Sequence, residues 1–187
     1  SLDMVAEFRE KDAVTPIILM GYLNPIETMG YGRFAERAAQ AGVDAMIIVN
    51  LPPEEAGDLG LLLSKNDIDL VYLLAPTTTD DRARMICQAS SGFVYYVSLK
   101  GTTGAGSLDI DDVREKMERF RAFSSLPVLV GFGIKDGETA ASVAAVSDGV
   151  VVGSAIVKLM DTQQTQKANI NSAVLELVSE IRHALDD

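Results

Sequence analysis

Cysteine and histidine are almost absent from this sequence of 187 residues, which contains one of each. Cys87 alone cannot form a disulfide within the chain, and no CxxC motif or Cys/His cluster indicates structural zinc. No apolar run reaches the ~18 residues of a transmembrane helix. The segment Ser1-Leu2-Asp3 has neither the basic start nor the apolar stretch of a signal peptide. We therefore expect a cytoplasmic protein that does not enter a membrane.

Basic residues are also scarce. The chain has 16 Lys and Arg against 27 Asp and Glu, a net charge of -11 and a pI near 4.5. The basic residues form no cluster, so nucleic acid is excluded as a partner. A small phosphorylated metabolite is not excluded, because backbone N–H groups and a helix dipole can bind an anion without a basic surface.

Apolar runs rich in β-branched or aromatic residues recur along the chain. Each run is nearly continuous rather than alternating, which is typical of parallel strands covered on both faces. The six runs that we predict to be strands are Pro16 to Leu23, Asp44 to Asn50, Asp69 to Leu74, Phe93 to Ser98, Pro127 to Gly133 and Gly149 to Gly153.

Amphipathic helical stretches separate these runs, and the alternation predicts an α/β fold with a parallel sheet and right-handed crossovers. No linker or low-complexity segment divides the chain, so we predict one domain over residues 1–187. The predicted helices are Arg33 to Ala41, Pro53 to Lys65, Asp80 to Ser90, Asp109 to Phe123, Asp136 to Val146 and Asn171 to Leu185, and Ser1 to Met4 resembles the start of another.

The position of the glycines favours a barrel over an open nucleotide-binding sheet. No GxGxxG motif follows the run that ends at Leu23, whereas the last two runs end in Gly131-Phe132-Gly133 and Gly153-Ser154. Many (β/α)8 TIM barrels build a phosphate site from the loops after their last two strands. Six runs correspond to about six βα units, which predicts a single partial TIM-barrel domain containing strands three to eight.

The ends of the other runs supply further candidate residues, because active sites in barrels lie at the C-terminal ends of the strands. Each has a plain structural alternative: a helix first turn for Glu54 and Glu55, a core position for Tyr95, a flexible loop for residues 101–106 and a surface position for His183. No Ser/His/Asp set, metal triad or convincing carboxylate pair occurs at these ends.

Five motifs in this order resemble the alpha subunit of tryptophan synthase: MGYLNP, NLPPEE, YYVSLKGTTGA, VGFGI and VGSAIVK. The resemblance covers nearly the whole chain and corresponds to the family from its third strand onward, with the N-terminal quarter absent. It implies a TIM-barrel lyase of tryptophan biosynthesis that cleaves indole-3-glycerol phosphate to indole and glyceraldehyde 3-phosphate. It further implies an α2β2 complex in which pyridoxal phosphate belongs to the beta subunit, while the alpha subunit uses no cofactor or metal.

The resemblance also implies roles for individual residues. The phosphate-binding residues would be Gly104, Gly131, Gly133, Gly153 and Ser154. The indole pocket would contain Tyr22, Tyr95 and Phe132, with Thr103 in the closing loop. The face that meets the beta subunit would contain Asn24, Asn50, Pro52, Glu54 and Glu55.

Two departures from the family pattern affect the expected function. The catalytic pair of the family, a Glu that ends strand two and an Asp in the following loop, precedes the matched region, so we expect no catalytic residue in this chain and little lyase activity. Asn50 stands where the family usually has Asp, and the lost charge is expected to weaken polar contacts at the subunit interface or around the closing loop. Two alternatives are another phosphate-binding barrel, such as indole-3-glycerol-phosphate synthase or phosphoribosylanthranilate isomerase, and a non-catalytic partner of the beta subunit.

Overall fold

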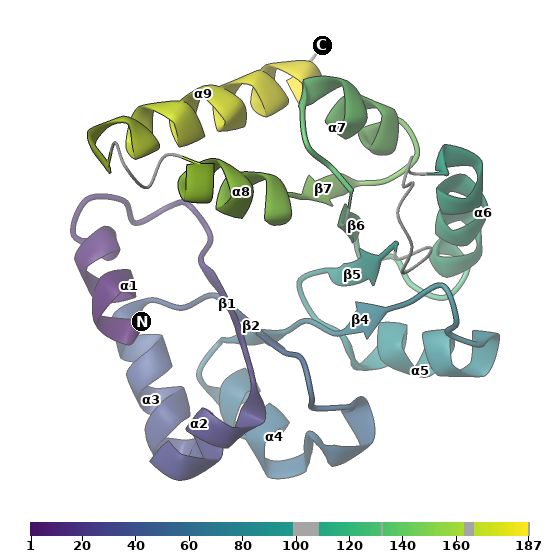
Figure 1. The fold of residues 1–187 in the computed structure, drawn as a ribbon. Coiled ribbons are helices and arrows are strands. Elements are labelled where there is room, and N and C mark those ends of the chain that lie inside the picture. Colours follow the sequence, from purple (N-terminus) through teal and green to yellow (C-terminus); the bar gives the residue numbers. More distant parts are fainter. Residues whose placement is uncertain (99–108, 132, 163–166, 187) are drawn as a thin grey trace. The chain divides into compact units, whose positions relative to one another are not determined.

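The computed structural model of the chain describes residues 1–98, 109–131, 133–162 and 167–186 (Figure 1). The chain divides into two compact units, Ser1–Leu73 with Asp81–Val94, and Leu74–Asp80 with Tyr95–Asp187. The predicted alternation of strands and helices is confirmed in both. Within the described ranges, no helix is both long and apolar enough to cross a membrane. The prediction of a single domain stays a prediction.

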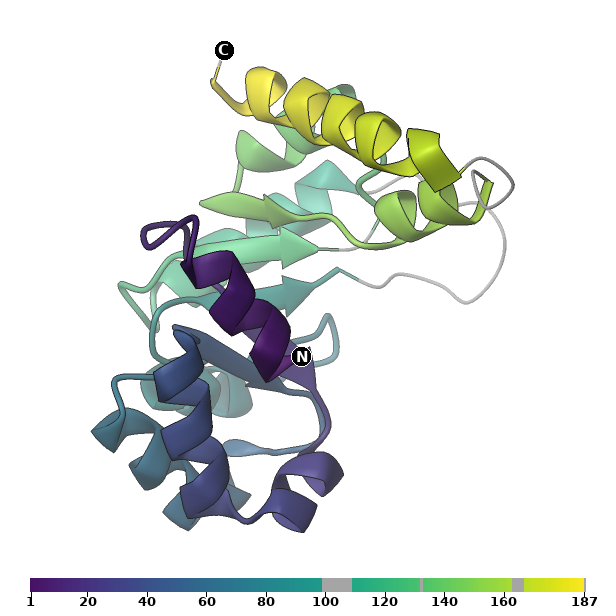
Figure 2. The same cartoon turned by 90° about the vertical axis from the view of Figure 1, so that its left-hand side faces the viewer.

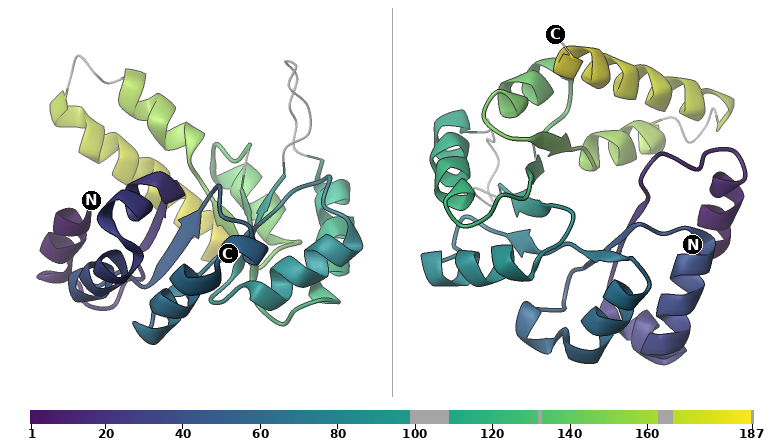
Figure 3. Two further views of the ribbon diagram at one scale, coloured as in Figure 1. Left: turned by 90° about the horizontal axis from the view of Figure 1, so that it is seen from below. Right: turned by 180° about the vertical axis from the view of Figure 1, so that it is seen from behind.

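The first unit is built on a parallel sheet in the order β1-β2-β3. Its helices α1 and α3 lie side by side, and α3 also packs against α4 (Figure 3). The elements are α1 (Leu2–Arg9), β1 (Ile18–Gly21), α2 (Leu23–Met29), α3 (Tyr31–Ala41), β2 (Ala45–Ile48), the 3-10 helix η1 (Pro53–Glu55), α4 (Gly57–Lys65), β3 (Asp69–Leu70) and nearly all of α5 (Asp80–Ala89).

The apolar runs explain the core of this unit. All four residues of β2 are buried, as expected for a strand covered on both faces. The buried side of α3 consists of Phe34, Ala35, Ala38 and Ala41, and the helix ends where Gly42 adopts the left-handed conformation, with φ of 89°. In β1, by contrast, Ile18 and Met20 are exposed, so this strand does not show the predicted double coverage.

The predicted strand that ended at Leu23 was too long. The strand stops at Gly21, and Leu23 is the first residue of α2. Two features favour a helix there: the side-chain oxygen of Asn50 accepts a hydrogen bond from the N–H of Leu23 at 2.8 Å, and Pro25 lies in the first turn, where a helix tolerates proline. The sequence analysis missed this helix.

The predicted strand from Asp69 to Leu74 is two short strands, β3 and β4 (Leu73–Leu74). Ser91, 21 residues further along the chain, bonds both backbone groups of Leu70 at this point. The N–H of Leu70 donates to the Ser91 hydroxyl at 2.9 Å, and the N–H of Ser91 donates to the Leu70 carbonyl at 3.1 Å. The pairing with β2 extends one residue further, since the N–H of Val71 donates to the Met46 carbonyl at 2.9 Å.

The second sheet has the order β4-β5-β6-β7, and β6 and β7 are parallel. Helix α9 packs against both α7 and α8 (Figure 2). The elements of the second unit, besides Leu74 of β4, are β5 (Val94–Val97, from Tyr95), α6 (Ile110–Arg121), β6 (Val128–Gly131), α7 (Gly137–Ala144), β7 (Gly149–Val151), α8 (Ser154–Thr162) and α9 (Lys167–Asp186).

An aromatic pair lies at the centre of this second core. Tyr96 of β5 and Phe120 of α6 are fully buried, with ring centroids 5.4 Å apart and planes inclined at 59°. Among the described residues no group accepts or donates a hydrogen bond at the buried Tyr96 hydroxyl. Burial raises the pKa of this hydroxyl to about 12, and the nearby Asp112 adds to the shift.

Replacing Tyr96 with phenylalanine is therefore expected to leave the free energy of unfolding unchanged or to raise it by up to about 1 kcal/mol, because the substitution removes a buried polar atom that has no partner. Phe120→Ala is the control, and should lower the free energy of unfolding by about 3–5 kcal/mol. Urea unfolding followed by circular dichroism measures both. A loss of 1 kcal/mol or more in Tyr96→Phe would mean that the hydroxyl has a stabilising partner in solution.

Candidate functional site

Two of the glycine-ended segments meet at one edge of the second sheet. Strands β6 and β7 are parallel neighbours, and Gly131 at the end of β6 pairs with Val151 at the end of β7. The segments that follow them, which contain Gly133 and Gly153, therefore leave the sheet at the same edge. This is the carboxyl edge, where parallel α/β proteins bind ligands.

Gly153 lies directly before α8 and has open space around it. A Cβ placed on Gly153 would meet no atom of the described residues within 4 Å, its two chain neighbours aside. Its carbonyl accepts the N–H of Val157 at 3.1 Å, which closes the first turn of α8. In the described parts of the chain, no acceptor is found for the N–H groups of residues 153–156, so the start of α8 offers several donors and the positive end of the helix dipole. This position is well suited to bind an anion.

The start of α7, which follows Gly133, is already occupied by side-chain acceptors. The Asp136 carboxylate accepts the hydroxyl and the N–H of Thr139, at 2.7 and 2.9 Å, in a capping box. These two hydrogen bonds hold the pKa of Asp136 below its usual range. The Glu180 carboxylate accepts the N–H of Gly137 at 2.9 Å. Two carboxylates at this helix start disfavour an anion, so the phosphate site is better placed at α8.

The other two glycines of the predicted site have identifiable backbone roles. Gly133 is exposed and has φ of 81°, a left-handed conformation that favours glycine. At Gly131, a Cβ would lie 2.6 Å from Cε2 of Tyr95 and even closer to its hydroxyl oxygen. The Gly131 carbonyl also accepts the backbone N–H and the hydroxyl of Ser98, at 3.0 and 3.1 Å. The absence of a side chain at Gly131 is thus explained by the ring of Tyr95.

Substituting alanine for Gly131 is expected to lower the free energy of unfolding by about 1–3 kcal/mol, because the new methyl group overlaps the Tyr95 ring. The double variant Gly131→Ala/Tyr95→Ala removes the ring and should lose less than the sum of the two single variants. Chemical unfolding of all three variants and the wild type gives the coupling. Strictly additive losses would show that the two residues do not touch.

The predicted indole pocket is only partly within the described residues. Tyr22 is the N-cap of α2 in the first unit and is largely exposed. Tyr95 lies on β5 in the second unit, and burial raises the pKa of its hydroxyl. Thr103, Phe132 and the predicted phosphate residue Gly104 lie outside the described residues, as do residues 101–106 of the proposed loop. His183 is exposed on α9, as predicted.

The residues predicted to meet the beta subunit all lie in the first unit. Asn24 is in α2. The side-chain oxygen of Asn50 accepts the first N–H of this helix, so asparagine at position 50 preserves the hydrogen-bond acceptor although it lacks the charge of aspartate. Pro52 precedes η1, which contains Glu54 and Glu55 in its first turn. The first-turn alternative for the two glutamates therefore agrees with the structure.

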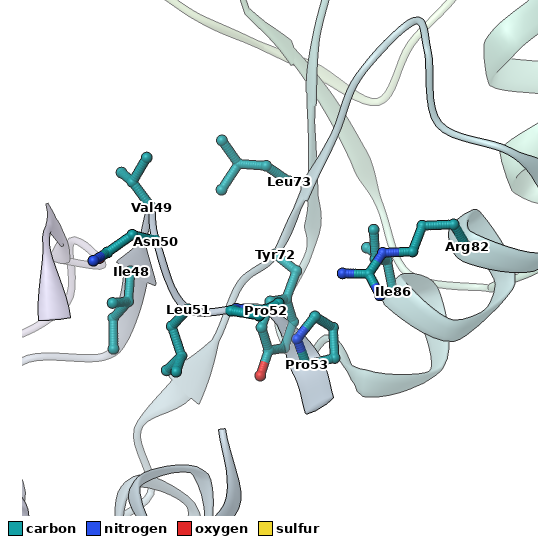
Figure 4. Close-up of a pocket in the computed structure, with 10 residues that line it drawn as sticks. All are labelled: Ile48, Val49, Asn50, Leu51, Pro52, Pro53, Tyr72, Leu73, Arg82 and Ile86. Atoms are coloured by element: carbon teal, nitrogen blue, oxygen red, sulfur yellow. The ribbon is translucent and has the colours of Figure 1, made fainter. Parts of the chain in front are cut away.

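A pocket of about 260 Å³ lies beside this segment (Figure 4). Arg82 extends from α5 toward the segment that holds the two prolines, and Tyr72 also lines the pocket. The Arg82 guanidinium forms an ion pair with Glu54. The pKa of Glu54 is lowered first by its own backbone N–H and then by Arg82. The lining residues are Ile48, Val49, Asn50, Leu51, Pro52, Pro53, Tyr72, Leu73, Arg82 and Ile86.

Sequence reasoning did not identify Arg82, Tyr72 or Glu180. Arg82 bonds to the carboxylate of Glu54, 28 residues away in the chain. Glu180 accepts the backbone N–H of Gly137, 43 residues away. No local motif signals such pairs. Tyr72 sits inside an apolar run, where an aromatic residue indicates core packing.

The chain matches the family model of the tryptophan synthase alpha chain over residues 1–186. The tryptophan synthase alpha chain of Thioalkalivibrio sulfidiphilus is 53% identical over 186 residues, which are 99% of this chain and 70% of that one. That of Marinobacter nauticus is 51% identical over 183 residues, 98% of this chain and 68% of its own length.

Solved structures show the same likeness. The crystal structure of the tryptophan synthase alpha chain from Legionella pneumophila has a TM-score of 0.88 and 42% identity, and covers 99% of this chain and 68% of that one. A structure from Pyrococcus furiosus, described as the tryptophan synthase a2b2 complex, has a TM-score of 0.84 and 34% identity over 97% of this chain and 72% of its own. The predicted α/β barrel class is confirmed. With the family model matched from residue 1 to residue 186 and about half of its residues identical to those of the alpha chains, this chain belongs to the tryptophan synthase alpha chain family.

Proposed function

We propose that this chain binds indole-3-glycerol phosphate as the alpha chain of a tryptophan synthase, with the phosphate at the start of α8. Membership of the family makes it part of a lyase of tryptophan biosynthesis. The observation that carries the proposed site is the pair of parallel strand ends at β6 and β7, followed by α8, before which a Cβ at Gly153 would meet no atom of the described residues within 4 Å.

The reaction proposed for the family fold is an aldol-type cleavage. The bond between the indole ring and the glycerol phosphate chain breaks, the ring carbon gains a proton, and a hydroxyl of the chain loses one. These proton transfers need an acid and a base in reach of the substrate. The predicted sites of this chain contain neither, since no catalytic residue was predicted within them. We therefore propose substrate binding by these 187 residues without efficient turnover.

No cofactor or metal ion is proposed for this chain, and pyridoxal phosphate is assigned to the beta chain. A cytoplasmic location also stays a prediction. The correspondence of this chain to the family from the third strand onward is likewise a prediction, and the comparisons lend no support to the predicted absence of an N-terminal quarter.

The proposed protein partner is a tryptophan synthase beta chain. The support is the family membership and the relatives described as an a2b2 complex. The proposed contact face holds Asn24, Asn50, Pro52, Glu54 and Glu55, all in the first unit. Within it, Glu54 is tied to Arg82, whereas Glu55 is exposed in the first turn of η1.

Purified beta chain mixed with this chain is expected to form a complex, seen by light scattering after size-exclusion chromatography. Glu55→Lys should weaken the affinity about tenfold, because it reverses a charge on the contact face. Glu36→Lys, the same change at an exposed position of α3, is the control and should bind like the wild type. Absence of any complex would favour the alternative of a phosphate-binding barrel that works without a beta chain.

A further inference from the structure

Helix α9 is a common neighbour of the two helices that follow the glycine segments. It packs against α7, which follows Gly133, and against α8, which begins after Gly153 (Figure 1). All three helices belong to the second unit. A change in the position of α9 would therefore change the distance between the Gly133 and Gly153 segments of the proposed phosphate site.

One side chain of α9 bonds directly to the start of α7. The Glu180 carboxylate oxygen Oε1 accepts the backbone N–H of Gly137, the first residue of α7, at 2.9 Å. This bond joins residues 43 positions apart. A carboxylate at the first turn of a helix also interacts favourably with the helix dipole.

The close approach of the two helices depends on the glycine at position 137. A Cβ placed there would lie 3.1 Å from Cβ of Ala184 and 3.3 Å from Oε1 of Glu180. Both distances are shorter than an ordinary van der Waals contact. Gly137 thus lets α9 come near enough for Glu180 to reach the backbone.

The rest of the first turn of α7 is fixed by its own side chains. The hydroxyl of Thr139 accepts the N–H groups of Lys135 and Asp136, at 3.1 and 3.2 Å. The short segment from Gly133 to Gly137 is therefore held at its far end by Thr139 and Glu180. Strand β6 ends at Gly131, just before this segment. A shift at the Gly137 end would therefore change the backbone conformation at Gly133.

We propose that Glu180 is a positioning residue, which fixes the start of α7 against α9 and thereby sets the Gly133 segment opposite the start of α8 for phosphate binding. This inference rests on the proposed function, since it assumes that a phosphate binds at the start of α8, beside the Gly133 segment. Glu180 itself does not touch the ligand.

The test is calorimetric titration of the 187-residue chain with glycerol phosphate, with thermal unfolding of each variant measured in parallel. Glu180→Ala is expected to weaken phosphate affinity roughly fivefold, the scale of a lost helix cap. Glu180→Gln keeps an acceptor oxygen on a side chain of equal length and should restore affinity to within about twofold. Glu176→Ala, one turn earlier on α9, is the matched control and should bind like the wild type.

A second pair of variants tests the same inference without altering charge. Gly137→Ala forces a methyl group against Ala184 and should also weaken phosphate binding, while Gly137→Ala/Ala184→Gly should recover it. Lower thermal stability with unchanged affinity in Glu180→Ala would overturn the inference, because it would show a merely structural role. Equal losses in Glu180→Ala and Glu180→Gln would overturn it as well. A wild type that does not bind glycerol phosphate would instead refute the proposed function, and the inference with it.

Discussion

Replacing Gly153 with leucine is expected to weaken the binding of glycerol phosphate by at least about 100-fold, while the midpoint of thermal unfolding stays within a few degrees of the wild type. The binding loss follows from two or three backbone N–H bonds to a charged oxygen, each of which contributes about 1.5–3 kcal/mol. The fold is expected to be spared because, in the part of the chain that the structure describes, no atom other than those of its chain neighbours lies within 4 Å of the position that a Cβ at Gly153 would take.

Gly32 provides the matched control for this variant. Among the described residues outside its own helix turn, Gly32 also has no atom within 4 Å of a Cβ position, but it lies in α3 of the first unit. Gly32→Leu should bind glycerol phosphate like the wild type. Unchanged affinity in Gly153→Leu would contradict the assignment of the phosphate to the start of α8. A collapse of thermal stability would show instead that Gly153 has a structural role.

The 187-residue chain is expected to release indole from indole-3-glycerol phosphate at no more than about 10⁻⁴ of the rate of an established tryptophan synthase alpha chain. General acid–base catalysis typically supplies 10²–10⁴-fold in rate for each positioned group, and the predicted sites contain no acid–base pair. Indole release, followed at saturating substrate beside an established tryptophan synthase alpha chain, measures the difference. The beta chain should be added in a parallel series.

Indole release at a rate near that of the established alpha chain would refute this expectation. Other groups in the 187 residues would then have to move the protons. The comparison has a built-in check, because a chain that binds glycerol phosphate but does not release indole is folded at the phosphate site.

The fold could be predicted from the sequence where a pattern is local. The buried strand β2 was predicted because its apolar run has no polar interruption. Helix α7, predicted over Asp136 to Val146, forms over Gly137–Ala144 and begins at the Asp136 cap. These features depend only on residues near one another in the chain.

The predictions from the sequence were wrong where the local structure involves a residue distant in the chain. The strand predicted through Leu23 gives way to α2, whose first N–H is bonded by Asn50, 27 residues away. The run from Asp69 to Leu74 divides at a point where Ser91 bonds both backbone groups of Leu70. Neither partner carries a motif that identifies its target.

The candidate site shows the same division. The glycines were predicted from their positions at strand ends, but the sequence could not distinguish among their roles. Gly131 accommodates the ring of Tyr95, and Gly153 faces open space. The choice of α8 over α7 for the phosphate depends on Glu180, whose contact with Gly137 spans 43 residues.

Amide NMR spectroscopy during a titration with glycerol phosphate tests the central claim most directly. We predict that the largest chemical-shift changes occur at the N–H groups of Gly153, Ser154 and Ala155, because these donors would bond the phosphate oxygens. The N–H groups of Gly137 and Thr139 should change little, since Glu180 and Asp136 already accept them. The largest changes at the start of α7, or in the first unit, would contradict the account.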